Sequence, residues 1–252
     1  MYDFQKANMW KRISAALFDF IMLITVIAGM ALLLSTVLGY DDYVTRMDEK
    51  YAEYEEAYGL SFDITAEEYQ ALSAEEKVAY DGANEAFGKD EEAIYLQNML
   101  FNNALIIVIF AILIAHLLLE FMVPLLFKNG QTLGKKIFGI GVMRVDGVRV
   151  TPVLMFARTV LGKCTVETLV PVLIVIMILF GIMGFFGTMV ILALLLFQII
   201  LVAATRARTP IHDLLAQTVT VDFASQMIFD TPEELLAYKK RIHAEEVENK
   251  KE

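Results

Sequence analysis

Residues 168–204 read TLVPVLIVIMILFGIMGFFGTMVILALLLFQIILVAA and contain no Asp, Glu, Lys or Arg. A single helix of this length would be about 55 Å long, whereas the hydrocarbon core of a bilayer is about 30 Å thick. Three glycines, Gly181, Gly184 and Gly187, lie near its centre. We therefore predict a hairpin of two short membrane-spanning helices within residues 165–205.

Two further apolar blocks extend this pattern toward the N-terminus. They run from Ile13 to Leu38 and from Met99 to Phe127, and each exceeds the roughly 20 residues that a helix needs to cross a bilayer. The whole chain is 57% hydrophobic, above the roughly 45–50% of soluble domains. The sequence therefore predicts an all-α membrane protein with four transmembrane helices. With one cysteine, Cys164, an intramolecular disulfide is excluded.

Basic residues gather in three regions that four spans would place on one side. The N-terminal segment holds Lys6, Lys11 and Arg12, residues 128–163 hold seven Lys and Arg, and Arg206 and Arg208 follow the last apolar run. Because short cytoplasmic segments carry the excess of Lys and Arg, we expect both termini in the cytoplasm of a multi-pass protein of the cell membrane.

This topology divides the chain into six segments. We expect a cytoplasmic N-terminus and first transmembrane helix (1–39), an acidic extracellular helical insertion (40–98), a second transmembrane helix (99–127), a cytoplasmic loop with a β-hairpin (128–164), the transmembrane hairpin (165–205) and a cytoplasmic tail (206–252).

The extracellular insertion is predicted to be helical and solvated. Residues 41–97 contain 17 Asp and Glu against four Lys and Arg. Thr65 and Ser73 are each followed three residues later by Glu, which is the capping-box pattern at the start of a helix. The insertion is either a solvated helical cap or an acidic surface that gathers cations near an entrance.

The predicted β-hairpin lies in residues 142–150, VMRVDGVRV, which alternate around Asp146 and Gly147. An Asp-Gly pair suits a two-residue type I′ turn. Residues 218–221, TVTV, offer a third strand. Thr231 and Pro232 then open a charged C-terminal helix.

Two of the apolar blocks contain ionisable residues. Asp19 is the only charged residue between Ile13 and Leu38, and a carboxylate there costs about 2.5–3.5 kcal/mol on insertion scales. His116 and Glu120 lie four residues apart, on one face of the second predicted helix. Such a pair in an apolar surround could exchange a proton near neutral pH. We therefore take Asp19, His116 and Glu120 as candidate ion or proton sites. A metal site at His116 and Glu120 would lack further ligands.

Three motifs together resemble a known family. They are WKRISAALFD (residues 10–19), the loop GQTLGKK (130–136) and IHDLLAQTV (211–219). In this order relative to the apolar blocks they resemble the RDD family, named for one arginine and two aspartates. The resemblance implies a family motif of Arg12, Asp19 and Asp213, and a glycine-rich loop after the second span that includes Gly130, Gln131, Thr132, Gly134 and Lys135. It also implies transport, including cation/proton antiport.

The motif residues admit a structural interpretation beside the functional one. Arg12 would pair with Asp213 and tie the start of the first helix to the chain after the last one, and Asp19 would accept hydrogen bonds from a neighbouring helix. The loop departs from the Walker spacing, so we expect a tight turn with Lys135 and Lys136 at anionic headgroups.

Two functions follow as hypotheses. The first is a cation- or proton-coupled transporter in the lipid bilayer. Because four spans are few for a transport path, we expect such a transporter to be a homo-oligomer. The second is a non-transporting membrane scaffold or accessory protein that acts through its extracellular segment or its tail. The sequence shows no catalytic constellation and no cofactor motif, so we expect no enzyme activity. Its sparse basic residues argue against nucleic-acid binding.

Overall fold

The computed structural model describes residues 7–127, 129–205 and 209–249. Four basic residues used to predict the orientation, Lys6, Lys128, Arg206 and Arg208, lie outside these ranges. The chain divides into two compact units, Met1–Ala28 with Ile112–Glu252 and Gly29–Ala111.

Four helices in the described part of the chain are long and apolar enough to span a bilayer. They are α1 (Met9–Val37), the continuous helix Glu91–Phe127, the helix Pro152–Leu179, and α10 (Gly184–Ala204). The second consists of α5 (Glu91–His116), the π-helical η1 (Leu117–Met122) and α6 (Val123–Phe127), and the third of α8 (Pro152–Phe156), the π-helical η2 (Ala157–Leu169) and α9 (Val170–Leu179). The predicted four-helix membrane architecture is confirmed.

The third spanning helix begins 13 residues earlier than the expected start at residue 165. The Thr151 hydroxyl accepts a hydrogen bond from the Leu154 amide, and Pro152 occupies the first position of the helix. This cap satisfies an amide that would otherwise lack a partner, and proline suits the first helical turn. Residues 152–164, expected in a loop, therefore belong to the helix.

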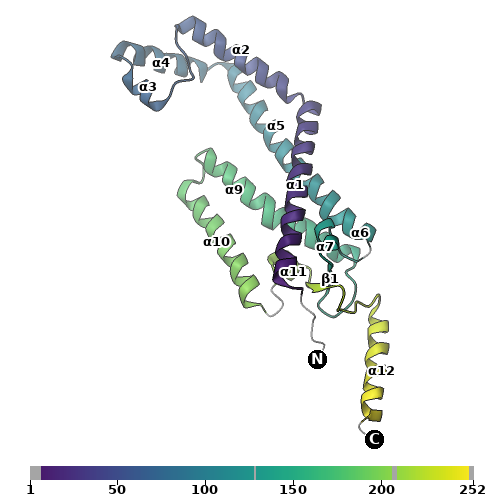
Figure 1. Cartoon of the computed structure of the whole chain (residues 1–252). Helices are drawn as coiled ribbons and strands as arrows, with labels where there is room; N and C mark the ends of the chain where they lie inside the picture. The colour runs from purple at the N-terminus through teal and green to yellow at the C-terminus, as the bar shows by residue number, and fades with distance from the viewer. Residues whose placement is uncertain (1–6, 128, 206–208, 250–252) are drawn as a thin grey trace. The chain divides into compact units, whose positions relative to one another are not determined.

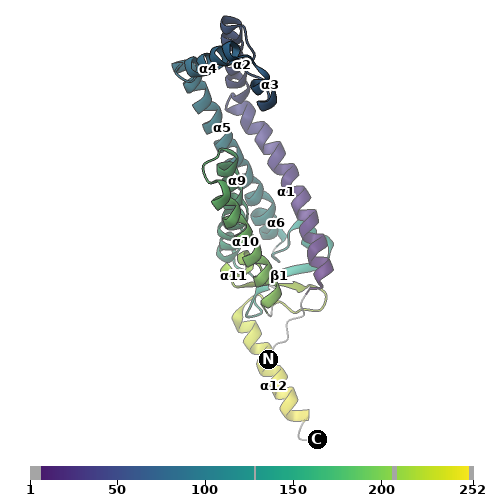
Figure 2. The ribbon, with the colours of Figure 1, turned by 90° about the vertical axis from the view of Figure 1, so that its left-hand side faces the viewer.

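A tight turn joins α9 to α10, which run side by side (Figure 1, Figure 2). Gly181 and Gly184 have φ angles of +71° and +46°, where a side chain would be strained. A Cβ at Gly187 would lie 2.7 Å from Cγ1 of Ile178, so glycine allows the two helices to approach. All three glycines of the predicted turn thus have a physical role.

The spanning helices α1 and α10 expose large apolar side chains. Leu17 and Phe20 of α1 are 58% and 57% exposed, and Leu195 and Ile199 of α10 are 55% and 62% exposed. A water-soluble protein rarely leaves such continuous apolar surface uncovered, whereas lipid acyl chains cover it at no cost. The exposed faces therefore agree with a membrane protein.

The small sheet differs from the predicted hairpin. β1 (Ile140–Arg144) pairs antiparallel with β2 (Thr218–Asp222), with Val142 opposite Thr220. A tight turn forms here, but it is not the predicted two-residue type I′ turn: the Gly147 amide donates to the Arg144 carbonyl at 3.0 Å, and Asp146 lacks the positive φ angle that a type I′ turn requires. The segment after it makes only one antiparallel bridge to β1, since it also pairs with Phe229. The expected third strand is thus the main partner of β1.

The unit that holds the sheet also contains two short helices, α7 (Leu133–Ile137) and α11 (Ile211–Leu215), and the longer C-terminal helix α12 (Pro232–Asn249). α12 begins at Pro232, as predicted, and its Leu235 packs with Val148 and Phe229. Lys11 at the start of α1 forms a 2.7 Å ion pair with Asp222 of β2.

The unit of residues 29–111 contains three helices of the predicted acidic insertion, α2 (Tyr40–Tyr58), α3 (Ala66–Ala71) and α4 (Ala74–Phe87). Both capping boxes form: Thr65 and Ser73 each exchange hydrogen bonds with the Glu three residues on. Tyr51 stacks on Phe87 with ring centroids 4.7 Å apart, which joins α2 to α4. The helical prediction for the insertion is confirmed.

Candidate functional site

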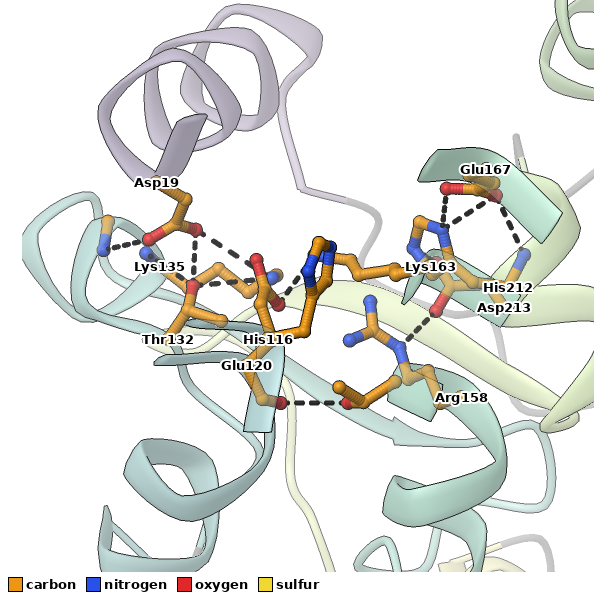
Figure 3. Close-up of polar contacts among 12 residues, drawn as sticks. Asp19, His116, Glu120, Thr132, Lys135, Arg158, Lys163, Glu167, His212 and Asp213 are labelled. Carbon is orange, nitrogen blue, oxygen red and sulfur yellow. Dashed lines mark hydrogen bonds and ion pairs between the residues drawn. The ribbon is translucent and has the colours of Figure 1, made fainter. Parts of the chain in front are cut away.

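The loop after the second span docks directly on Asp19. The Asp19 carboxylate accepts hydrogen bonds from the Thr132 hydroxyl and, at 2.7 Å, from the Gly134 amide (Figure 3). A Cβ at Gly134 would collide with the Ala15 carbonyl oxygen and lie 2.9 Å from Oδ1 of Asp19. Only glycine allows this approach. The intramembrane aspartate and the glycine-rich loop, two separate signals in the sequence, therefore form one structure.

The other motif residues shape the loop. Gly130 has a φ angle of +67°, and the space around it is closed by Val142 and Met155. The Gln131 side chain donates to the Ile140 carbonyl at 2.8 Å, which ties the loop to β1. Gly130 and Gln131 thus place Thr132 against Asp19.

Lys135 lies inside the protein, which corrects the expectation that it meets lipid headgroups. Its side chain is 10% exposed, and its Nζ lies 3.3 Å from the Thr132 hydroxyl and 4.0 Å from Oδ2 of Asp19. Burial, followed by repulsion from Lys163, lowers the pKa of Lys135 to about 7. The neighbouring Lys136 instead places its Nζ 3.8 Å from the centre of the Phe127 ring.

A second ion pair joins the second and third spanning helices. Oε2 of Glu120 lies 2.5 Å from Nζ of Lys163, and the Glu120 side chain is 6% exposed. The Thr159 hydroxyl donates to the main-chain carbonyl of Glu120 at 2.8 Å. Glu120 is therefore held by both its carboxylate and its backbone.

The π-helical form of η2 decides which of its side chains meet. At α-helical spacing Arg158 and Glu167 would project about 180° apart. In η2 the hydrogen bonds span five residues instead of four, and Arg158, Lys163 and Glu167 line the same cavity. Neither Arg158 nor Lys163 was predicted as a site residue, because both were expected in the cytoplasmic loop of residues 128–164.

Asp213 forms its ion pair with Arg158. The two side chains meet at 2.7 Å and are each 1% exposed, and the Thr218 hydroxyl also donates to Asp213 at 2.7 Å. The expectation that Arg12 pairs with Asp213 is therefore wrong: the helix that begins at Pro152 carries Arg158 inside. Burial raises the pKa of Asp213, but the charges of Arg158 and His212 and the hydrogen bonds from Arg158 and Thr218 together outweigh burial and lower it. The expected tie between the two chain segments is made by Lys11 and Asp222.

Each histidine of the site has one nitrogen in a fixed role. Nδ1 of His116 lies 2.8 Å from the Ile112 carbonyl, so it carries a hydrogen, and Nε2 is able to accept a proton. Its neighbour at 3.4 Å is the Thr168 hydroxyl, which donates to the Lys163 carbonyl. The His212 ring approaches Glu167 at 2.8 Å.

All three candidate ion or proton residues line one cavity of about 590 Å³ within the unit that holds the sheet. Asp19 comes from α1, and His116 and Glu120 come from the second spanning helix. The ionisable lining consists of Arg12 and of nine residues labelled in Figure 3: Asp19, His116, Glu120, Lys135, Arg158, Lys163, Glu167, His212 and Asp213. A separate cavity of about 100 Å³ is lined by Gln198 of α10 and shares Glu167 with the first cavity.

The charges that line this cavity nearly cancel, and a change in protonation alters their sum. Four carboxylates face four basic side chains and two histidines, so the lining is nearly neutral when both histidines are neutral. The lining also includes apolar side chains of α1, among them Phe20, Leu23 and Ile24. In such a setting the gain or loss of one proton changes the net charge by one unit, and charges at a partly buried site interact more strongly than in bulk water.

Comparison with known proteins adds one match. The model of the family described as RDD family matches residues 6–217. No curated protein and no solved structure matches the chain.

Proposed function

This chain belongs to the RDD family, and from that membership and the charged cavity we propose that it exchanges a monovalent cation for a proton across the cell membrane. The observation that carries the proposal is the convergence of Asp19, His116 and Glu120 on one cavity. These residues come from two different spanning helices. Ionisable residues inside a membrane usually mark ion or proton paths.

The cavity contains both kinds of group that such an exchange needs. Asp19 offers a carboxylate, the ligand type that hard cations prefer. His116 offers Nε2 as a proton acceptor, and Lys135 titrates near neutral pH. Cation binding and proton release at neighbouring groups would therefore be coupled through charge.

The remaining features of the proposed carrier concern its placement in the membrane. We propose that both termini lie in the cytoplasm, that the acidic insertion lies outside, and that the protein works as a homo-oligomer. The excess of Lys and Arg in three segments supports the orientation. The exposed apolar side chains of α10 supply a surface on which copies could pack.

The test is proton movement in proteoliposomes that contain the purified full chain and a trapped pH-sensitive dye. Imposed Na⁺, K⁺ or Li⁺ gradients should drive proton movement through the wild type, and Asp19→Asn should reduce the rate at least tenfold. Asp146→Asn is the matched control, because Asp146 pairs with Arg144 on the surface. If no gradient drives proton movement through the wild type, the proposal is wrong.

A second candidate is a non-transporting scaffold or accessory protein. It is favoured by the ion pairs and hydrogen bonds that hold Asp19, Glu120, Glu167 and Asp213, since paired buried charges can fix geometry alone. In that case Asp19→Asn lowers the melting temperature in detergent, and a specific partner co-purifies. Recovery of nothing but the chain itself from mild detergent would argue against this function.

A further inference from the structure

A cleft of about 550 Å³ lies within the unit of residues 29–111, in the acidic insertion. Its walls come from α2, the loop after α2, the helix α4 and the first turns of α5. A cavity of this size suits a small molecule. All residues of this unit are described, and none of those that line the cleft has a basic or an aliphatic side chain. The side chains that give it its chemistry are four aromatic rings and two carboxylates: Tyr51, Phe62, Tyr80, Phe87, Glu55 and Asp63.

Local hydrogen bonds build the wall that carries Phe62. The helix α2 ends at Tyr58, and Gly59 turns the chain with a φ angle of +64°, which glycine adopts without strain. Oε1 of Glu55 then accepts hydrogen bonds from the Phe62 amide at 2.7 Å and from the Ser61 hydroxyl at 2.9 Å. The chain is thereby folded back against the last turn of α2, so this wall is formed before any ligand binds.

The aromatic rings meet at steep angles around Phe62. Its ring centroid lies 5.8 Å from that of Tyr51, 6.1 Å from that of Tyr80 and 5.5 Å from that of Phe87. The corresponding angles between ring planes are 62°, 58° and 50°, so none of these neighbours stacks in parallel on Phe62. Tyr51 remains 38% exposed. Ring faces carry partial negative charge and attract a cation within about 6 Å of the ring centre.

The two carboxylates keep their negative charge. Oε2 of Glu55 and both carboxylate oxygens of Asp63 make no hydrogen bond or ion pair with the described residues. The four bases of residues 41–97 are engaged elsewhere: Arg46, Lys50 and Lys89 in ion pairs and Lys77 at a main-chain carbonyl. The cleft therefore combines two uncompensated negative charges with four aromatic rings.

We propose that this cleft binds a small, water-soluble organic cation with a quaternary or methylated ammonium group. Aromatic rings recognise such weakly hydrated cations, and the carboxylates supply the opposite charge. A calcium ion needs six to eight oxygen ligands and would gain little from the rings. A lipid would need an apolar surface for its acyl chains, and the cleft has no aliphatic lining. This site shares no residue with the cavity of the proposed function and does not depend on it.

The test measures choline binding to the purified full chain in an uncharged maltoside detergent. Choline chloride replaces NaCl at constant ionic strength, and NMR line broadening of the trimethylammonium protons reports the bound fraction. We expect saturable binding to the wild type. Tyr80→Leu keeps an apolar side chain but removes a ring of the cleft, and should weaken binding about two- to fivefold. Tyr58→Leu is the matched control, because Tyr58 stacks on Tyr54 outside the cleft.

A second set of variants tests the carboxylates. Asp63→Asn should weaken choline binding about two- to fivefold. Asp48→Asn makes the same change of net charge at an exposed position outside the cleft, and should bind as the wild type does. Glu55→Gln keeps an oxygen that accepts from the Phe62 amide, and together with Asp63→Asn it should weaken binding about tenfold. The melting temperature of each variant in NaCl reports whether it folds.

The inference is overturned if the wild type shows no saturable choline binding, or if Tyr80→Leu and Tyr58→Leu bind choline equally. Equal weakening by Asp63→Asn and Asp48→Asn would assign the effect to the overall charge of the insertion and also overturn it. Displacement of choline by calcium chloride at micromolar concentration would make the carboxylates a metal site instead. The flux assay is a separate measurement: a wild type that binds choline but moves no protons overturns the proposed function and leaves this site standing.

Discussion

Arg158 and Asp213 lie 55 positions apart in the sequence and form a 2.7 Å ion pair in which both side chains are 1% exposed. Desolvation makes such a pair costly to break on one side only. Nη1 of Arg158 and Oδ2 of Asp213 are buried and have no hydrogen-bond partner among the described residues, and both residues line the cavity. The pair therefore joins η2 to α11 and faces the site.

Removing one member of this pair should destabilise the protein severely. We expect Asp213→Leu to leave the Arg158 charge buried and unpaired, at a cost of about 3–5 kcal/mol. The double variant Arg158→Met with Asp213→Leu should recover much of that loss, because no charge is then left buried. Melting temperatures in detergent compare the two. A single variant as stable as the wild type would contradict the burial of this ion pair in the protein.

The close contact between Gly134 and α1 predicts that adding one methyl group at this position lowers the stability of the protein. Gly134→Ala places a Cβ against the Ala15 carbonyl and the Asp19 carboxylate, so the loop must move away. Overpacking of this kind costs about 1–3 kcal/mol, and cation binding should weaken with it. Gly29→Ala is the control in the same helix as Asp19, because its Cβ meets nothing within 4 Å. Equal melting temperatures for the two variants would contradict the docking.

His212 predicts a loss of stability in weak acid. Burial lowers the pKa of His212, despite the opposing attraction of Asp213. Below about pH 6.5 the unfolded chain therefore binds a proton here more readily than the folded protein, and stability falls as pH falls toward the lowered pKa. His212→Asn should flatten the dependence of the melting temperature on pH between 5 and 7. An unchanged slope in the variant would rule out this contribution.

The capping boxes of the acidic insertion predict local effects. Thr65→Ala and Ser73→Ala each remove a hydroxyl that accepts a backbone hydrogen bond, at a cost of about 0.5–2 kcal/mol. Hydrogen exchange should speed up in α3 for the first variant and in α4 for the second. Serine in place of Thr65 preserves the cap and serves as control. Exchange that accelerates equally in α10 would show that the effect is not local.

The sequence predicted those parts of the fold that depend on composition and local chemistry. Long apolar runs identified the four spanning helices, and Gly181 and Gly184 marked the turn between the last two. The motifs also identified the family correctly. Each of these signals is contained in a short stretch of chain, and needs no knowledge of what it packs against.

The partners within the site could not be predicted in the same way. Arg158 was assigned to a loop because the uncharged run begins only at residue 168, yet the Thr151 cap starts the helix at Pro152. Lys135 was expected at the membrane surface because lysine usually is, yet its side chain is only 10% exposed and contacts Thr132. Pairing between distant residues depends on helix register and tertiary packing, which periodicity does not reveal.

The π-helical form of η2 makes the cavity sensitive to chain length. Deleting the exposed Leu161 would keep every charged residue of the site. It would nevertheless turn Arg158 by roughly a quarter of a turn relative to Lys163 and Glu167, because a helix whose hydrogen bonds span five residues has more residues per turn than the 3.6 of an α-helix. Two homologous chains with identical charges would then differ in chemistry through a one-residue gap alone. The count of residues between Arg158 and Glu167 is thus as much a part of the site as the residues themselves.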